Sequence, residues 1–214
     1  LSFPLSFPAR NSAYCIGRTM FETDRLPEAW KRPMERMDEI WVPSQFNVET
    51  FANAGIPRNK LVVMPQGVDI HEFNPATVEP LPLPLSDRKL VKFLSVFEWS
   101  SRKGAEELID AYLTAFTEND NVVLYIKTYL SQHVVGHAVK GTKEEVQAVV
   151  QQEIDRIWHR HSSLKDWFVS RPKPPTIVVL GDHIPSHVLP SLYKAVDCFV
   201  LPSRGEGWGR PYME

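Results

Sequence analysis

The sequence of 214 residues predicts an α/β protein built on doubly wound parallel sheets. First, short runs rich in valine and isoleucine, such as 122–126 and 176–180, have the composition of strands buried on both faces. Second, stretches with apolar residues at helical spacing separate these runs. Third, glycine and proline mark many of the boundaries. Strands and helices that alternate in this way form parallel sheets with helices on both faces.

The first part of the chain, residues 1–66, predicts the strands and helices of one α/β unit. Pro27 suits the first turn of its first helix, whereas Pro33 argues against one unbroken helix there. Ser44 is a good N-cap for the second helix, which ends at Gly55. The predicted elements are strand 14–20, helix 26–37, strand 38–43, helix 45–54 and strand 60–64.

The composition changes between residues 67 and 88, where prolines are frequent and hydrophobic periodicity is weak. This pattern is typical of an extended, semi-rigid linker. We therefore expect a domain boundary here, with a linker over 67–88 and a second domain over 89–214. The prolines of the linker are Pro75, Pro80, Pro82 and Pro84.

The second domain repeats the alternation of strand and helix. In doubly wound sheets, ligands bind beyond the carboxyl ends of the strands. The loops that follow residues 97, 126, 180 and 201 are therefore the places where a site is expected. The predicted elements are strand 90–97, helix 104–117, strand 122–126, helix 143–161, strand 176–180, helix 186–195 and strand 197–201.

Composition and charge narrow the classes of partner. The net charge of −2 gives no basic field over the whole sequence, so we expect no nucleic acid partner. No apolar run approaches the length that spans a bilayer, so we expect no transmembrane segment. No targeting signal is recognisable; the compartment stays open, with the cytoplasm favoured. Cys15 and Cys198 lie in apolar runs and are expected to be buried free thiols.

The loop after the last predicted strand has the residue types of a ligand site. Gly205, Gly207 and Gly209 allow a ligand to approach the backbone closely. Pro211 is well placed as the first residue of a following helix. The free N–H groups and the positive dipole end of a helix start favour a phosphate.

Two carboxylates lie in the same segment. Glu206 is in the loop, and Glu214 falls about one turn into the predicted helix. Carboxylates so placed can accept hydrogen bonds from vicinal hydroxyls, the commonest polar feature of a sugar or a ribose. Either glutamate alone is more often a solvated surface acid, but their combination with the strand end, the glycines and the proline points to a site.

Several segments together resemble one family. The segment from Glu206 to Glu214 resembles the E-x7-E signature of the group 1 glycosyltransferases, glycosyltransferase family 4, whose proteins have the two-domain GT-B fold. Arg102-Lys103-Gly104 looks like the phosphate-binding turn of that family. Further similar segments, in the family's order, are 21–24 (F-E-T-D), 42–44 (V-P-S), 65–69 (P-Q-G-V-D) and 73–75 (F-N-P).

The resemblance implies a GT-B-like protein present as a fragment. Residues 1–66 would be the C-terminal part of an N-terminal, acceptor-side Rossmann-like domain, and 89–214 a donor-nucleotide-binding domain truncated at its C-terminus. The first residue is not methionine, and the chain stops within a predicted helix. The fragment is therefore expected to bind donor weakly and to turn over nothing.

The resemblance also implies roles for individual residues. Lys103, with Arg102 beside it, would contact the donor diphosphate. Glu206 would bind hydroxyls of the transferred sugar at the catalytic centre, and Glu214 would bind the ribose hydroxyls. Backbone N–H groups directed at sugar or phosphate are implied for Gly207, Trp208 and Gly209.

The implied reaction is transfer of a sugar from a nucleotide-sugar donor to a glycan, lipid or small-molecule acceptor. The family retains the anomeric configuration and needs no cofactor or metal, since cationic side chains and helix dipoles stabilise the leaving diphosphate. His133 and His137 have the spacing of a metal pair on a helix, but no third ligand is recognisable nearby, and we expect no metal site.

One position departs from the family. Glu98 stands five residues before Lys103, where the family commonly has an arginine. Its charge would repel a diphosphate unless Arg102 supplies the missing positive charge or Glu98 points away. A non-catalytic nucleotide- or glycan-binding protein with the same fold is therefore an alternative function. A third interpretation is a doubly wound domain that binds a phosphate ligand without any use for Glu206.

Overall fold

The computed structural model describes residues 4–7, 13–86, 89–134, 137–162 and 173–214. Contacts divide the chain into two units. The first unit consists of Leu1–Val68 together with Gly205–Met213, and the second consists of Asp69–Arg204 together with Glu214. The segment Gly205–Met213, which follows the last strand of the second unit, thus packs with residues from the start of the chain.

The first unit contains a three-stranded parallel sheet. Strands β1 (Ile16–Arg18), β2 (Glu39–Val42) and β3 (Leu61–Val63) lie in the order β1-β2-β3. Met34, Ile40 and Phe51 are completely buried in its core. The helical elements of this unit are η1 (Pro4–Ser6), η2 (Glu28–Trp30), α1 (Lys31–Glu35), α2 (Gln45–Asn53), η3 (Arg58–Lys60) and α6 (Arg210–Met213).

Local sequence signals account for the helices of this unit. The Ser44 hydroxyl accepts a hydrogen bond from the backbone N–H of Asn47 at 3.3 Å, so Ser44 caps α2 as predicted. After α2, Gly55 adopts the left-handed conformation with φ +100°, which glycine allows at little cost. The region of the first predicted helix is divided into η2 and α1, so it is not one unbroken helix, but the division precedes Lys31 and Pro33 lies within α1.

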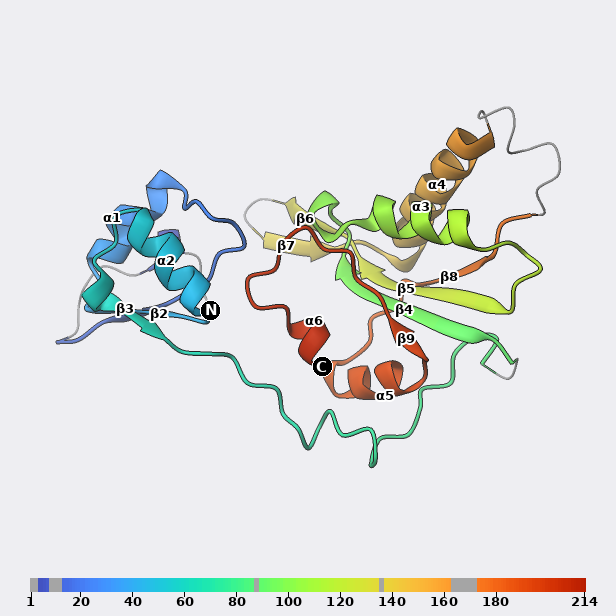
Figure 1. Cartoon of the computed structure of the whole chain (residues 1–214), viewed down its shortest axis with the longest axis horizontal. Coiled ribbons are helices and arrows are strands. Elements are labelled where there is room, and N and C mark those ends of the chain that lie inside the picture. Colours follow the sequence, from blue (N-terminus) through green and yellow to red (C-terminus); the bar gives the residue numbers. More distant parts are fainter. Residues whose placement is uncertain (1–3, 8–12, 87–88, 135–136, 163–172) are drawn as a thin grey trace. The chain divides into compact units, whose positions relative to one another are not determined.

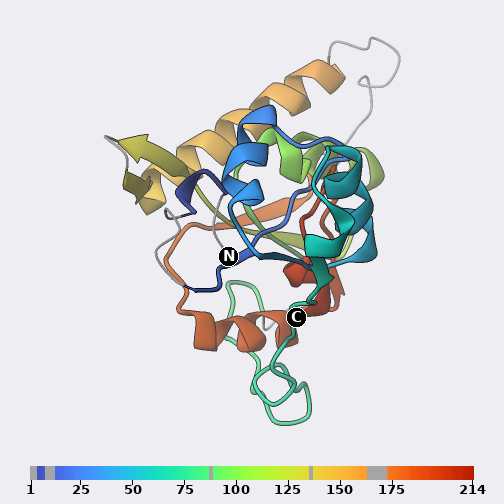
Figure 2. The same ribbon diagram turned by 90° about the vertical axis from the view of Figure 1, so that its left-hand side faces the viewer.

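The second unit contains a four-stranded parallel sheet. Its strands are β4 (Val91–Glu98), β5 (Val122–Tyr129), β8 (Thr176–Leu180) and β9 (Cys198–Phe199), in the order β8-β5-β4-β9. Helices α3 (Ala105–Ala115) and α4 (Lys143–Ser162) lie on one face of the sheet, and α5 (Leu189–Lys194) lies on the other (Figure 1). In the view turned by 90°, α4 and α5 also lie on opposite sides of the sheet (Figure 2).

Apolar side chains fill the space on both faces of this sheet. Leu124 and Ile126 pack with residues of α3 and α4 on one face. Val123 and Tyr125, the alternate residues of the same strand, pack with Leu192 of α5 on the other face. Residues 122–126 are therefore buried on both sides, which explains why they form a continuous apolar run. The predicted α/β, doubly wound, Rossmann-like architecture is confirmed.

The segment predicted as a linker contacts α5, and its residues from Asp69 on belong to the second unit. The backbone N–H of Leu81 donates to the carbonyl oxygen of Ser191 at 2.8 Å, and Leu83 is buried against the sheet core. The described residues of the predicted linker form no helix or strand. The short elements η4 (Ser101–Lys103) and η5 (Ser186–Val188) complete the unit.

Two features differ from the sequence predictions. An antiparallel hairpin, β6 (Ser131–Val134) and β7 (His137–Lys140), follows β5 and was not predicted. Its register places His133 and His137 on separate strands rather than on one helix. The expectation of two buried thiols is wrong, because Cys15 is half-buried and Cys198 is exposed, although both are free. Cys198 is exposed because β9 is the edge strand of its sheet.

Candidate functional site

The order of the strands defines where a ligand would bind the second unit. From β4 the chain adds β5 and then β8 on one side, and it returns to place β9 on the other side of β4. In open α/β sheets, the crevice at such a reversal of strand order is the usual ligand site. The loops after β4 and β9 border this crevice. They contain the Arg102-Lys103-Gly104 turn and the start of the glycine-rich segment.

These two loops are held together by close backbone contacts. Gly104 has φ +73°, and a Cβ atom there would lie 2.2 Å from the carbonyl oxygen of Pro202. The backbone N–H of Arg204 donates to the carbonyl oxygen of Arg102 at 2.8 Å. Only glycine permits both the left-handed backbone and this approach. The turn that carries Lys103 is thus fixed directly against the segment that follows β9.

The lysine turn also begins helix α3. Gly104 is the N-cap residue of α3 and has no side chain to bond the amides of the first turn. Lys103 itself is only 9% exposed, while Arg102 is half-buried. A buried cation beside uncapped helix amides is an arrangement that favours an anionic group such as a phosphate.

Glu98 adds a negative charge to the same edge of the sheet. It is the last residue of β4 and pairs in register with Tyr129, the last residue of β5. Burial and the nearby charge of Glu98 both raise the pKa of the Tyr129 hydroxyl above its usual value. The carboxylate therefore lies at the carboxyl edge of the sheet, beside the phenol of Tyr129.

The glycine-rich segment Gly205–Gly209 packs with the early residues of the first unit. A Cβ atom on Gly207 would lie 2.5 Å from the sulfur of Met20, so the loop backbone lies directly on that side chain. The Nε1 of Trp208 donates to the carbonyl oxygen of Gln66 at 3.1 Å. Glu206, between Gly205 and Gly207, is half-buried.

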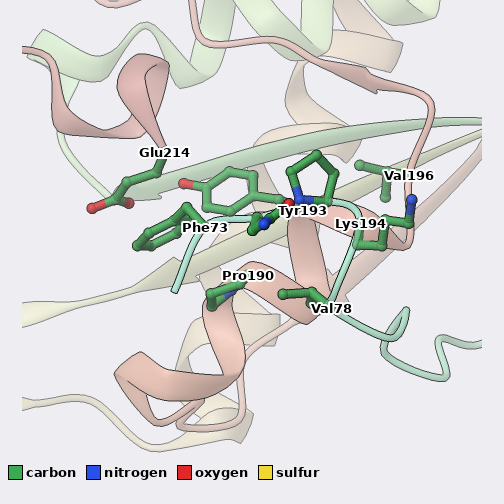
Figure 3. Close-up of a pocket in the computed structure, with 9 residues that line it drawn as sticks. Phe73, Val78, Pro190, Tyr193, Lys194, Val196 and Glu214 are labelled. Atoms are coloured by element: carbon green, nitrogen blue, oxygen red, sulfur yellow. The ribbon is translucent and has the colours of Figure 1, made fainter. Parts of the chain in front are cut away.

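Glu214 lines a pocket in the second unit. The pocket has a volume of about 320 Å³, and Figure 3 shows the Tyr193 ring directed with its hydroxyl toward Glu214 and the Phe73 ring beside it. The centroids of the Phe73 and Tyr193 rings are 6.2 Å apart. The full lining is Phe73, Asn74, Pro75, Val78, Pro190, Tyr193, Lys194, Val196 and Glu214.

The structure therefore brings together some of the expected site residues within each unit. Arg102 and Lys103 lie with Pro202–Arg204 in the second unit, which also holds Glu214 in its pocket. The segment with Glu206 and Trp208 belongs to the first unit.

Lys127, a second buried lysine of the second unit, was not predicted as a site residue. It lies near the carboxyl end of β5, is 8% exposed, and its Nζ donates to the carbonyl oxygen of Thr128 at 3.3 Å. The signal in the sequence was a lysine directly after the apolar run 122–126. A lysine is rarely buried without a partner or a function.

Two kinds of feature are absent from the described residues. These residues contain no cluster of three or more histidine, cysteine, aspartate or glutamate side chains arranged to hold a metal ion. Within the same part of the chain, no helix combines the length and the apolar character needed to cross a membrane.

Comparison with known proteins identifies the class of fold. No protein-family model matches the sequence. No curated protein matches it either. Solved structures do match, and they show that the chain has the α/β fold of GT-B glycosyltransferases.

Three of these structures illustrate the similarity. Anabaena HepE, in complex with UDP and glucose, is 18% identical, with a TM-score of 0.56 over 85% of this chain and 42% of HepE. A glycosyltransferase of Rickettsia africae is 16% identical, with a TM-score of 0.53 over 87% of this chain and 45% of that protein. An E. coli trehalose-6-phosphate protein bound with UDP-2-fluoro glucose is 14% identical, with a TM-score of 0.53 over 83% of this chain and 43% of that protein. This chain thus spans less than half of each of them.

Proposed function

We propose that the chain is the donor-binding part of a glycosyltransferase that transfers a sugar from a nucleotide-sugar to an acceptor. The observation that carries this proposal is the position of the lysine turn. Arg102-Lys103-Gly104 lies at the reversal of strand order between β4 and β9, in backbone contact with the segment that leads to Glu206. Fold likeness alone does not fix a function. The chemistry of these residues supports it.

The diphosphate of the donor would bind at the lysine turn. Lys103 and Arg102 supply positive charge, and the uncapped amides of α3 supply hydrogen-bond donors. In a glycosyl transfer, negative charge grows on the diphosphate as the bond to the sugar breaks. Donors fixed in advance around that charge stabilise the transition state. The proposed site therefore works without a metal ion, and the reaction is proposed to retain the anomeric configuration, as in the group 1 glycosyltransferases that the sequence resembles.

The nucleoside end of the donor would bind where Glu214 lies. The pocket around Glu214 has apolar walls with two aromatic rings and a carboxylate at its border, which suits a base and a ribose with vicinal hydroxyls. Glu206 would bind hydroxyls of the transferred sugar. The UDP and UDP-sugar complexes of the similar structures favour a uridine donor as the first ligand to test.

Binding of UDP to the chain with Lys103→Ala tests the proposal. We expect the variant to bind at least about tenfold more weakly, because a charge-assisted hydrogen bond to the diphosphate is lost. Lys173→Ala removes the same charge from an exposed lysine ahead of β8, at the opposite edge of the sheet, and should bind UDP as the wild type does. Equal affinities of the wild type and Lys103→Ala in calorimetric titrations would contradict the proposal.

The position of Glu98 favours a second candidate, a non-catalytic nucleotide- or glycan-binding protein. Its carboxylate at the carboxyl edge of β4 would weaken diphosphate binding. Hydrolysis of a nucleotide-sugar by the full-length protein separates an enzyme from a binding protein. A site that recognises phosphate alone predicts in addition that Glu206→Gln leaves the affinity for UDP-glucose unchanged.

A further inference from the structure

Three residues of the first unit form an anchor for the glycine-rich loop. Trp208 donates its indole N–H to the carbonyl oxygen of Gln66 at 3.1 Å. The side-chain amide of Gln66 donates to the sulfur of Met20, 3.6 Å away. All three residues are half-buried and belong to the same unit. We refer to Met20, Gln66 and Trp208 as the loop anchor.

The loop backbone packs closely on both sides of Glu206. On one side, a Cβ atom at Gly207 would lie 2.5 Å from the sulfur and 2.8 Å from the Cγ atom of Met20. On the other side, a Cβ atom at Gly205 would lie 3.4 Å from the carbonyl oxygen of Glu22. Glu206 is thus carried by two glycines that each pack against residues 20–22.

We propose that Trp208 is a positioning residue whose indole hydrogen bond fixes the carboxylate of Glu206 for contact with the transferred sugar. This inference rests on the proposed function. A segment with three glycines in five residues has high conformational entropy when free. Restriction of such a loop before the ligand arrives lowers the entropy lost on binding. The anchor supplies this restriction through a side chain that does not itself need to touch the sugar.

A positioning role has a consequence that a purely structural role lacks. The nucleoside and the diphosphate are assigned to Glu214 and Lys103, and only the sugar to Glu206. Loss of the anchor should therefore weaken the binding of UDP-glucose and leave the binding of UDP unchanged. Damage that reached the second unit would weaken the binding of both ligands together, and damage confined to the first unit would lower the free energy of unfolding of that unit.

The experiment measures dissociation constants of UDP and UDP-glucose by calorimetry for the wild type and Trp208→Phe. We expect the preference for UDP-glucose over UDP to fall about fivefold, the effect of one neutral hydrogen bond, with the affinity for UDP unchanged. Trp41→Phe is the matched control, because the Trp41 indole donates to Glu39 on β2, at 2.8 Å, in the same unit. This control should keep the wild-type preference.

A second pair of variants tests the packing of Gly207 on Met20 within the loop anchor. Gly207→Ala should lower the preference for UDP-glucose because the new methyl group meets Met20. Met20→Ala combined with Gly207→Ala removes that collision and should restore part of the preference. Amide hydrogen exchange should become faster over residues 205–209 in Trp208→Phe and stay unchanged in Trp41→Phe.

The binding measurements distinguish a failure of the positioning role of Trp208 from a failure of the proposed function. If the wild type binds neither UDP nor UDP-glucose, the proposed function and the positioning role are both wrong. If Glu206→Gln removes the preference for UDP-glucose but Trp208→Phe retains it, the proposed function stands and the proposed positioning role of Trp208 is wrong. If Trp208→Phe and Glu206→Gln each remove the preference and the double variant loses no more, the two residues act as one unit.

Discussion

Glu98 is the residue that would oppose donor binding in the proposed site. It is the last residue of β4, five positions before Lys103, and its charge is close enough to Tyr129 to raise the pKa of that hydroxyl. The same charge acts against a diphosphate at the lysine turn. The residue would therefore make the proposed site weaker than one in which this position is neutral or basic.

Removal of this charge should tighten binding. We expect Glu98→Gln to bind UDP about fivefold more tightly at low ionic strength, an effect of the size that one nearby like charge has at a partly solvated site. The gain should shrink as salt is added, because salt screens partly exposed charges. Glu79→Gln, at an exposed position of the linker, serves as the control. An unchanged affinity in Glu98→Gln would mean that Glu98 is not near the bound diphosphate.

Single residues also mark the limit of prediction from the sequence. Ser44 and Gly55 were predicted correctly because a cap and a C-terminal glycine act within one turn of a helix. The pair of His161 and Asp110 was not predicted. The His161 ring is 7% exposed and its Nε2 lies 2.6 Å from Asp110, on another helix. Contacts between distant residues have no local sequence signal.

At the scale of elements, the turn from β4 into α3 depends on Gly104. Alanine at this position should destabilise the second unit by about 1 to 2 kcal/mol for the left-handed backbone. The collision of its methyl group with the carbonyl oxygen of Pro202 should add about 1 to 3 kcal/mol. Urea titration of Gly104→Ala and the wild type gives the free energy of unfolding of that unit, and the difference between them measures the two costs together.

A second glycine, Gly55, separates the cost of the left-handed backbone from the cost of the collision in the free energy of unfolding. It has φ +100°, but no atom lies within 4 Å of the position of its missing Cβ. Gly55→Ala should therefore show only the backbone cost, measured on the transition of the first unit. Similar losses for Gly55→Ala and Gly104→Ala would contradict the close packing of the lysine turn on Pro202.

An ion pair between α2 and η3 makes the first unit sensitive to acid. Both terminal nitrogens of Arg58 donate to the carboxylate of Glu49, with 2.8 Å for Nη1. These hydrogen bonds, with one from Gln45, lower the pKa of Glu49 to about 2 from its usual 4.5. Because the pKa is lower in the folded state, the stabilisation is complete above pH 4.5 and is lost as the pH falls toward 2.

The test compares the free energy of unfolding of the wild type and Glu49→Gln across this range. The difference between them should be largest above pH 4.5 and should shrink as the pH falls toward 2. Lys31→Gln is the control, because Lys31 pairs with Glu28 at 2.7 Å and not with Glu49. This variant should show the same dependence on pH as the wild type. A difference that does not depend on pH would contradict the lowered pKa of Glu49.

Most strands and helices were predictable, but the hairpin of β6 and β7 was not. Strands β4, β5 and β8 were recognised because burial on both faces requires continuous apolar runs. The hairpin strands are four residues each and mix polar with apolar residues, so their sequence resembles a loop. The predicted strand at 197–201 is only two residues long, since β9 pairs with β4 on one side only.

At the scale of the whole molecule, the fold is shared with solved GT-B structures at 14 to 18% identity. Identity can be this low because the fold depends on the pattern of buried and exposed positions rather than on particular residues. The pattern predicted two α/β regions joined by a linker. It gave no indication that Gly205–Met213 packs with residues from the start of the chain, because that contact joins segments far apart in the sequence.

The proposed function requires that a nucleotide diphosphate bind at the lysine turn between β4 and β9. A crystal structure of the chain with UDP tests it most directly. We predict diphosphate oxygens within hydrogen-bonding distance of the Lys103 Nζ and of the first amides of α3. Clear density for UDP at any other place, such as the carboxyl end of β8 with the lysine turn empty, would contradict the claim.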